Sequence, residues 1–441
     1  MIRTASVALL VLQSVVSGFG RNTEQVVRGS SARTSQETPN IEALLRDATV
    51  RQSLDTAKNT EAQTLADQVR FCETAAPPFR EAARGELLRR AFTQLGLQNV
   101  RIDAVGNVLG DRPGLTPRPR LVVAAHLDTV FPPETEVTVK RGGTKFNGPG
   151  IGDNCRGLAV LVAVIRALRA SAVKTPASIT FVANVGEEGL GNLRGVKELF
   201  GVTKNSAAAR TTGPTGAIDR FVSIDGPGVF VTHVAVGSHR YLVTFKGPGG
   251  HSYGAFGTAS PIGALGRAVA KIAQLQVPDP PRTTFNVGRI GGGTAVNAIP
   301  ADAWMEVDLR SSDPAVLASL DARFQGAIDA AVVEENARWG KAGEVTVTRS
   351  LVGDRPASSV PPASPIVQTA VAAARSLGFS AQLSEASTDA NLPMSLGIPA
   401  ITIGGGGSGT DAHALTESFD STDSWKGTQH ALLVIIALAQ K

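Results

Sequence analysis

The sequence AAHLDTVFP, residues 124–132, ends an apolar run that starts at Leu121. An unbroken run of Leu, Val and Ala predicts a strand that is buried on both faces. His126 and Asp128 follow at once, although neither side chain tolerates burial without a partner. Polar groups at the end of a buried strand are typical of the ligand-binding edge of an α/β sheet.

The segments around this run alternate between strand and helix patterns. Residues 178–185 (SITFVANV) and 221–225 (FVSID) predict two more short buried strands, and residues 156–171 (RGLAVLVAVIRALRAS) predict a helix. Residues 41–75 and 81–96 are helical by the spacing of their apolar side chains. This alternation indicates an α/β layer with parallel strands.

Acidic residues follow the other two predicted strands. Glu187 and Glu188 come after the second strand, and Asp225 ends the third. Paired glutamates are usually surface charge, so each residue alone has an ordinary explanation. Together these residues would meet at one rim of the sheet, where a metal ion can satisfy their charge.

Two further segments lead toward the same rim. Asp153 precedes the helix in GPGIGDNCRG (148–157), where a helix cap and a glycine turn are the ordinary explanation. His413 follows the buried run IPAITIG (398–404), which returns a late segment to the sheet edge. We interpret the glycines between that run and His413 as a loop whose backbone approaches the substrate.

Zinc chemistry accounts for these residue types. Imidazole and carboxylate groups are zinc ligands, and a carboxylate can bridge two cations. A ligating histidine commonly donates its other ring N–H to a nearby carboxylate. Asp128 is therefore expected to orient His126.

Length, charge and cysteine content limit the domain number and the classes of partner that we expect. A chain of 441 residues predicts two domains. Its net charge of +5 is spread without a dense basic run, which argues against a nucleic-acid partner. We expect Cys72 and Cys155 to be free thiols, with a single disulfide bridge as the alternative.

The first residues predict export. Residues 1–18 (MIRTASVALLVLQSVVSG) have the charged start, apolar centre and small-residue end of a signal peptide, and are too short to span a membrane. Residues 19–40 are polar and predict a disordered tether. A periplasmic or secreted location follows; a frayed helix on a cytoplasmic protein is the alternative.

Eight motifs in this order resemble those of the dinuclear-zinc peptidase family that includes acetylornithine deacetylase, succinyl-diaminopimelate desuccinylase, carboxypeptidase G and peptidase T. The motifs are HLDTV, GIGDNCRG, GEEGLGN, SIDG, GPGGHS, NAIP, DLR and DAHALTE. The resemblance implies an α/β fold: a catalytic domain with a mixed central sheet flanked by helices, and an inserted ferredoxin-like α/β sandwich. It places the catalytic domain at 41–233 and 351–441 and the insert, a lid and homodimerisation domain, at 234–350.

The same resemblance implies two zinc ions per chain, with cobalt or manganese as substitutes. It assigns His126 and Asp225 to one ion and Glu188 and His413 to the other. Asp153 would bridge the two ions. Glu187 becomes the general base, which takes a proton from water and passes it to the leaving nitrogen.

Three residues of the insert also match family motifs. By the resemblance, His251 stabilises the oxyanion, and Asn297 and Arg310 bind substrate. Their ordinary interpretations are a turn histidine, a capping amide and a salt-bridged arginine.

The resemblance implies hydrolysis of an amide bond. Residues 387–407 and the motif IGDNCRG look closer to the peptidase T-like branch, which favours short peptides and an aminopeptidase or di/tripeptidase activity. The alternatives are an N-acyl-amino-acid deacylase or a carboxypeptidase of the same family, and a non-catalytic peptide-binding protein. Cys155 beside Asp153, and Asp411 beside His413, depart from the expected pattern.

Overall fold

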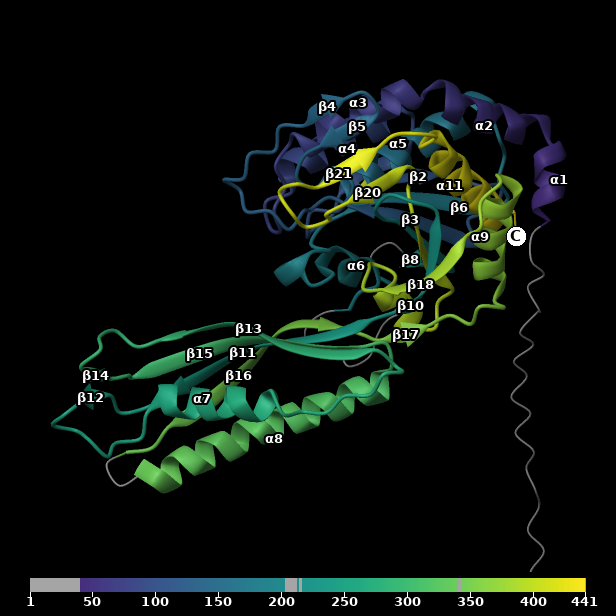
Figure 1. Cartoon of the computed structure of the whole chain (residues 1–441). Coiled ribbons are helices and arrows are strands. Elements are labelled where there is room, and N and C mark those ends of the chain that lie inside the picture. The colour runs from purple at the N-terminus through teal and green to yellow at the C-terminus, as the bar shows by residue number, and fades with distance from the viewer. Residues whose placement is uncertain (1–39, 203–211, 214–215, 340–342, 441) are drawn as a thin grey trace, which may run out of the picture. The chain divides into compact units, whose positions relative to one another are not determined.

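The apolar run at residues 121–125 lies in the middle of a sheet in the computed structural model (Figure 1). It forms β3 (Arg120–His126), which lies between β6 (Ser178–Asn184) and β9 (Arg220–Ile224) and is parallel to both. All three strands are buried along almost their whole length. This burial matches their unbroken apolar sequences.

The structure describes residues 40–202, 212–213, 216–339 and 343–440. The predicted signal peptide and all of the predicted tether except Asn40 lie outside the described residues. Within the described ranges, no helix is long and apolar enough to cross a membrane.

The central sheet is mixed, as predicted. Its order is β1-β2-β6-β3-β9-β19-β10-β17, with β18 beside β10. The inner strands β6, β3, β9 and β19 are parallel, whereas β1, β2, β10 and β17 join in antiparallel pairs. The other strands are β1 (Gln98–Ile102), β2 (Val108–Arg112), β10 (Phe230–Ala235), β17 (Ser358–Ser359), β18 (Gln382–Ala386) and β19 (Ala400–Ile403).

A layer of helices packs against this sheet. The central helix, α5 (Cys155–Ser171), is apolar on nearly all sides and contacts β3 and β9. Around it lie α2 (Ala48–Asn59), α3 (Glu61–Cys72) and α11 (Trp425–Leu438) (Figure 1). The sheet and these helices share the main hydrophobic core.

The helical segment at residues 41–75 is broken into three helices. α1 (Ile41–Arg46) ends at Asp47, whose side chain accepts hydrogen bonds from the backbone of Thr49 and Val50 and so caps α2. The other helices of this part are α4 (Ala82–Gln94), the 3-10 helix η1 (Gly189–Gly191), α6 (Arg194–Leu199), α9 (Pro365–Ser376) and α10 (Asn391–Ser395).

A small antiparallel sheet stands beside the core. Its order is β20-β21-β5-β4, and its aromatic residues pack with both cysteines, which are free and buried. The free thiols agree with the prediction. The strands are β4 (Lys140–Gly142), β5 (Lys145–Asn147), β20 (Ser408–Thr410) and β21 (Ser418–Asp420); a separate short hairpin comprises β7 (Thr212–Gly213) and β8 (Gly216–Ala217).

The predicted insert contains a second antiparallel sheet with the order β13-β15-β11-β16. Helices α7 and α8 pack on one face of it, where every second residue of β15 is buried (Figure 1). The elements are β11 (Gly237–Lys246), β12 (Gly250–His251), α7 (Pro261–Ile272), β13 (Thr283–Gly292), β14 (Ala298–Ile299), β15 (Asp302–Ser311), α8 (Pro314–Trp339) and β16 (Thr346–Arg355).

Both predicted boundaries of the insert fall inside a strand. The boundary before residue 234 cuts β10, which pairs with the central sheet as far as Ala235. The boundary after residue 350 cuts β16, which pairs with β11 along its length up to Arg355. The sequence motifs predict two strands and a helix after α7, but they do not predict β16. This strand is largely exposed and has no run of buried apolar residues that would mark it in the sequence.

Candidate metal centre

His126 and Asp225 meet because their strands are neighbours. His126 is the last residue of β3, and Asp225 directly follows β9. The His126 Nε2 atom lies 3.6 Å from Asp225 Oδ1 and 3.0 Å from Asp153 Oδ1. These three side chains form one group that could hold a metal ion.

His413 closes a second group from a distant part of the chain. It lies in the loop between β20 and β21, and its Nε2 atom is 3.1 Å from Asp153 Oδ2 and 3.0 Å from Glu188 Oε1. Asp153 therefore presents one carboxylate oxygen to each histidine. Its Oδ1 atom is buried and accepts no hydrogen bond among the described residues.

This donor set fits two divalent cations with Asp153 between them. It consists of two imidazoles and three carboxylates, which are ligand types that zinc accepts. Hydrogen bonds to Asp153 and Glu188 raise the pKa of His413 to about 10, so the cluster favours positive charge at this point. A metal ion would supply that charge directly.

The loop that carries Asp153 is held by Glu417, a residue to which the sequence analysis assigns no role. The buried Glu417 carboxylate accepts backbone hydrogen bonds from Gly150, Gly152 and Asp153 at 2.8–2.9 Å. Glu417 lies four residues after His413, in the motif DAHALTE. One short segment thus provides a candidate ligand and also positions the candidate bridge.

Asp128 lies beside His126, as predicted, and also contacts the glutamate pair. His126 Nδ1 lies 3.0 Å from the backbone oxygen of Asp128 but 3.7 Å from its carboxylate Oδ1. The carboxylate also accepts the backbone N–H groups of Glu187 at 3.0 Å and Glu188 at 2.7 Å. Asp128 therefore contacts the His126 ring through its backbone oxygen and its carboxylate, and the same carboxylate positions the glutamate pair.

This geometry predicts the effect of Asp128→Ala. Two buried N–H groups would lose their acceptor, which typically costs about 1–3 kcal/mol each. We expect denaturant unfolding to show a free energy lowered by about 2–6 kcal/mol, and zinc affinity to fall as well, because the glutamate pair that Asp128 holds includes the candidate ligand Glu188. A 10–100-fold loss of zinc affinity with unchanged stability would instead favour the predicted carboxylate–imidazole contact.

Glu187 lies beside this cluster and is buried. One carboxylate oxygen of Glu187, one of Glu188 and a ring nitrogen of His126 lie within 4.8 Å of one another. Burial raises the pKa of Glu187 well above its ordinary value, and the Arg355 guanidinium, 2.8 Å from Oε1, opposes that shift. A carboxyl group with a raised pKa is suited to proton transfer near neutral pH.

Two buried residues behind the cluster were not predicted as site residues. Arg355 ends β16, the strand that the sequence analysis did not expect. The Asp389 carboxylate accepts a hydrogen bond from Asn184 at 2.8 Å, and burial raises its pKa to about 7. The sequence signal for Asp389 was its place in the segment 387–407, which resembles the peptidase T-like branch.

No hydrogen bond or ion pair joins the three insert residues to this cluster among the described residues. The exposed His251 ring accepts backbone hydrogen bonds from Tyr253 and Gly254, and the exposed Asn297 has no side-chain hydrogen bond in the described part of the chain. Arg310 pairs with Asp308 at 2.7 Å. These contacts match the ordinary interpretations of the histidine and the arginine.

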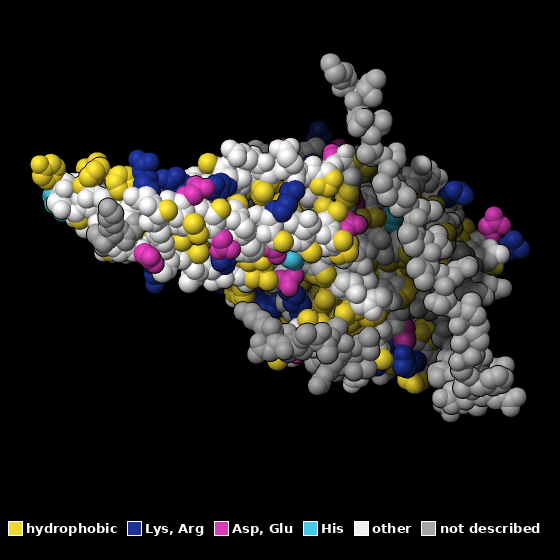
Figure 2. All heavy atoms as spheres, turned by 90° about the horizontal axis from the view of Figure 1, so that it is seen from below, with side chains coloured by type: hydrophobic (Ala, Val, Ile, Leu, Met, Phe, Trp, Pro, Cys, Tyr) yellow, Lys and Arg dark blue, Asp and Glu magenta, His cyan; other side chains and the backbone are white. Residues whose placement is uncertain are grey.

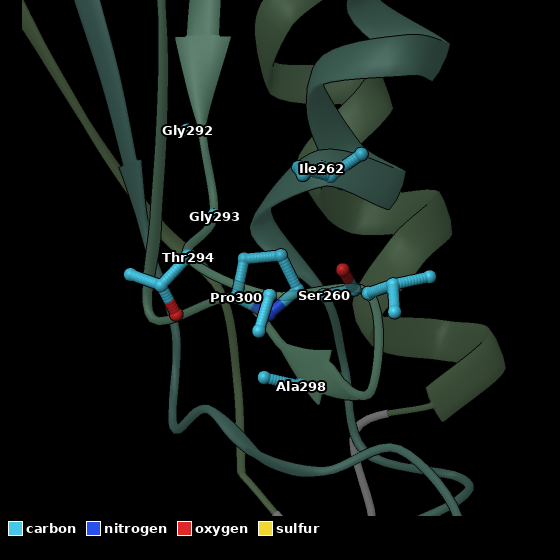
Figure 3. A pocket seen from close by; sticks show the side chains of 9 residues that line it. Ser260, Ile262, Gly292, Gly293, Thr294, Ala298 and Pro300 are labelled. Atoms are coloured by element: carbon cyan, nitrogen blue, oxygen red, sulfur yellow. The ribbon is translucent and has the colours of Figure 1, made fainter.

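The loops that carry His251 and Asn297 are apolar and exposed. Tyr253, Phe256 and Val296 have relative exposures of 90%, 81% and 102%, and Figure 2 shows hydrophobic side chains gathered at this end of the insert. A hollow of about 470 Å³ adjoins Val296, between the start of α7 and the end of β13 (Figure 3).

The glycines at residues 404–407 lie close to other backbone segments of the chain. A Cβ atom on Gly404 would lie 2.4 Å from the Gly228 oxygen, and one on Gly406 would lie 2.6 Å from the Gly427 backbone. Residues 404–406 are buried. Gly404 and Gly406 are needed because backbone segments of the chain pack closely together, and the approach of a substrate to this loop stays a prediction.

Comparison with known proteins gives one family match. The model of the family described as Peptidase family M20/M25/M40 matches residues 122–437. A succinyl-diaminopimelate desuccinylase from Nitrosospira multiformis is 26% identical over 298 residues, covering 64% of this chain and 76% of that protein. Carboxypeptidase G2 from Pseudomonas sp. strain RS-16 is 25% identical over 286 residues, covering 63% of each chain.

Solved structures share the fold at lower identity. The aminopeptidase PepT from Bacillus cereus has a TM-score of 0.65 and 20% identity, covering 91% of this chain and 99% of that chain. A tripeptidase from Staphylococcus aureus has a TM-score of 0.67 and 21% identity, covering 92% and 100%.

Proposed function

Since the chain belongs to peptidase family M20/M25/M40 and is thus a hydrolase of peptide or amide bonds, we propose that it is a dinuclear zinc peptidase that cleaves short peptides. The observation that carries the proposal is the Asp153 carboxylate, which presents one oxygen to His126 and the other to His413. This is the arrangement that a carboxylate bridging two cations requires.

In this proposal each metal ion has its own pair of ligands, and Asp153 is shared. The pairs are His126 with Asp225 and Glu188 with His413. When bound, two zinc ions supply Lewis acidity and lower the pKa of water in the site.

The residues of the chain then provide the proton transfers. Glu187 takes a proton from the attacking water and gives it to the leaving nitrogen. Its raised pKa supports this role. His251 donates a hydrogen bond to the developing oxyanion, and Asn297 and Arg310 bind the substrate.

Short peptides with a free N-terminus are the proposed substrates. The fold likeness to an aminopeptidase and a tripeptidase is compatible with this choice. The alternative is an N-acyl-amino-acid deacylase or a carboxypeptidase, and the names of two sequence relatives, a desuccinylase and a carboxypeptidase, favour it.

A substrate panel separates these activities. The purified, zinc-loaded protein is incubated with dipeptides, tripeptides, N-acyl amino acids and peptides with a blocked N-terminus, and the products are identified by mass spectrometry. Release of the N-terminal residue from free tripeptides supports the proposal. Cleavage only of N-acyl amino acids, or release only of the C-terminal residue from blocked peptides, would replace it by the alternative.

We also propose that the protein is a homodimer in which His251 serves the partner's metal site. The exposed apolar loops around His251 support this proposal, because a large exposed apolar patch commonly marks an interaction site. Within its own chain the His251 ring has only local contacts among the described residues.

Mixing a Glu187→Gln chain with a His251→Ala chain tests this arrangement. A mixed dimer would contain one site with an intact base and an intact histidine, so random exchange would restore about one quarter of the sites. Hydrolysis rates are measured after subunit exchange has been confirmed by native mass spectrometry. Activity no higher than the sum of the two parents would mean that His251 acts within its own chain or not at all.

A further inference from the structure

Arg355 makes a direct contact with the proposed general base. It is the last residue of β16, and its side chain is buried. The Nη1 atom donates to Glu187 Oε1 at 2.8 Å and to Ser387 Oγ at 3.2 Å. The Nη2 atom donates to the backbone oxygen of Glu187. One guanidinium group thus binds both the side-chain carboxylate and the backbone oxygen of Glu187.

The strand end that carries Arg355 is itself fixed against the glutamate loop. The backbone N–H of Asp354 donates to Asn192 Oδ1 at 2.8 Å, and its oxygen accepts a hydrogen bond from Lys197. On the neighbouring strand β11, Arg240 Nη1 donates to the Gly189 oxygen at 2.6 Å. The end of the second sheet and the segment following Glu187 therefore form one hydrogen-bonded unit.

The Glu187 side chain depends on this contact for its position. Within the described residues, Arg355 is the hydrogen-bond donor to its carboxylate, and only Oε1 is bound. The Oε2 oxygen has no hydrogen bond there. A glutamate has three side-chain torsions, and a catalytic group has to be held within about 0.5 Å of its productive position.

We propose that Arg355 is a positioning residue, which holds Oε1 of Glu187 so that Oε2 faces the water from which it takes a proton. The inference rests on the proposed function, because it assigns Glu187 the role of base. It also means that β16, the strand that crosses the predicted boundary after residue 350, contributes to the site through its last residue, apart from any role of His251.

A double-mutant cycle tests this role. We expect Arg355→Met to lower kcat by about 10–100-fold, with little change in KM and in zinc content. Arg355→Lys keeps the charge and one donor, so it should recover part of kcat. In a Glu187→Gln background the Arg355→Met change should have no further effect, because residues that act as one unit are not additive.

Arg240→Met is the matched control. It removes an arginine that binds the same loop without touching Glu187, so kcat should fall much less than in Arg355→Met. Three results would overturn the proposal. The first is a loss of kcat in Arg240→Met equal to that in Arg355→Met, and the second is an equal effect of Arg355→Met in the wild type and in the Glu187→Gln background. The third is a raised KM at unchanged kcat in Arg355→Met. The last result would indicate substrate binding by Arg355.

Crystal structures distinguish a failure of the proposed function from a failure of the positioning role. If the wild-type protein hydrolyses no substrate of the panel, the proposed function fails, and crystal structures of the wild type and Arg355→Met, which has no donor for Glu187 Oε1, test the positioning role by themselves. An unchanged, well-ordered Glu187 carboxylate in the variant would overturn it. A displaced or disordered carboxylate would support it. If Arg355→Met does not fold, the kinetics of Arg355→Lys are decisive: a kcat below that of the wild type at unchanged KM supports the positioning role, and an unchanged kcat overturns it.

Discussion

Glu187→Gln is expected to lower turnover by a factor on the order of 10²–10⁴ while both metal ions stay bound. The amide cannot take a proton from water, so the proposed acid–base step is lost. The amide side chain still offers an oxygen to Arg355, and the contacts of Asp128 are with the backbone, so the loop is expected to keep its shape. Steady-state kinetics and elemental analysis of the same preparation measure the two effects.

Glu188→Gln is the matched comparison, because it is the same substitution one residue further along. The Oε1 atom of Glu188 lies 3.0 Å from His413 Nε2, in one of the candidate metal groups. We expect this variant to bind metal more weakly and to regain activity at high zinc concentration. Glu187→Gln should not regain it. If the two variants exchanged these behaviours, the assignment of base and ligand within the pair would be reversed.

Removal of metal ions is expected to abolish hydrolysis, and two equivalents of zinc per chain are expected to restore it. The oxyanion and the attacking water would lose the charge that stabilises them. Zinc should also stabilise the fold, because a ligand present at 100 times its Kd adds about 2.7 kcal/mol. Chelation, zinc titration with thermal unfolding, and elemental analysis measure these effects.

Asp411→Asn is the control for this prediction. Asp411 is close to His413 in sequence, but its carboxylate accepts a hydrogen bond from Thr416 and belongs to none of the candidate metal groups among the described residues. The variant should keep both ions and most activity. At most one metal ion per active chain, together with full activity in the presence of a chelator, would contradict the dinuclear proposal.

The fold class and the family were both predictable from the sequence, and the structure and the family match confirm them. Long apolar runs fix which segments are buried strands, and the parallel order of β6, β3 and β9 brings their ends to one edge. The structure also brings the five predicted ligands together in two groups. Their roles as ligands stay a prediction, as do the roles of His251, Asn297 and Arg310.

The supporting contacts of the site were not predictable from sequence patterns. The Asp128 carboxylate was expected beside His126, and it also accepts hydrogen bonds from the glutamate loop, which the sequence did not indicate. The expected contact was a local one, between residues two positions apart, whereas the additional contact joins two different strand ends. Local proximity in the sequence therefore indicated only one of the two partners of Asp128.

The sequence by itself thus determined which segments form the buried strands and which residue types end them, because periodicity and apolar runs are local properties of a chain. Only the tertiary structure decided which polar group pairs with which. Arg355 and Glu187 are 168 residues apart, and Glu417 and Gly152 are 265 residues apart. Such pairs form because buried polar groups require partners, and the order of strands in the folded sheets determines which partners lie within reach.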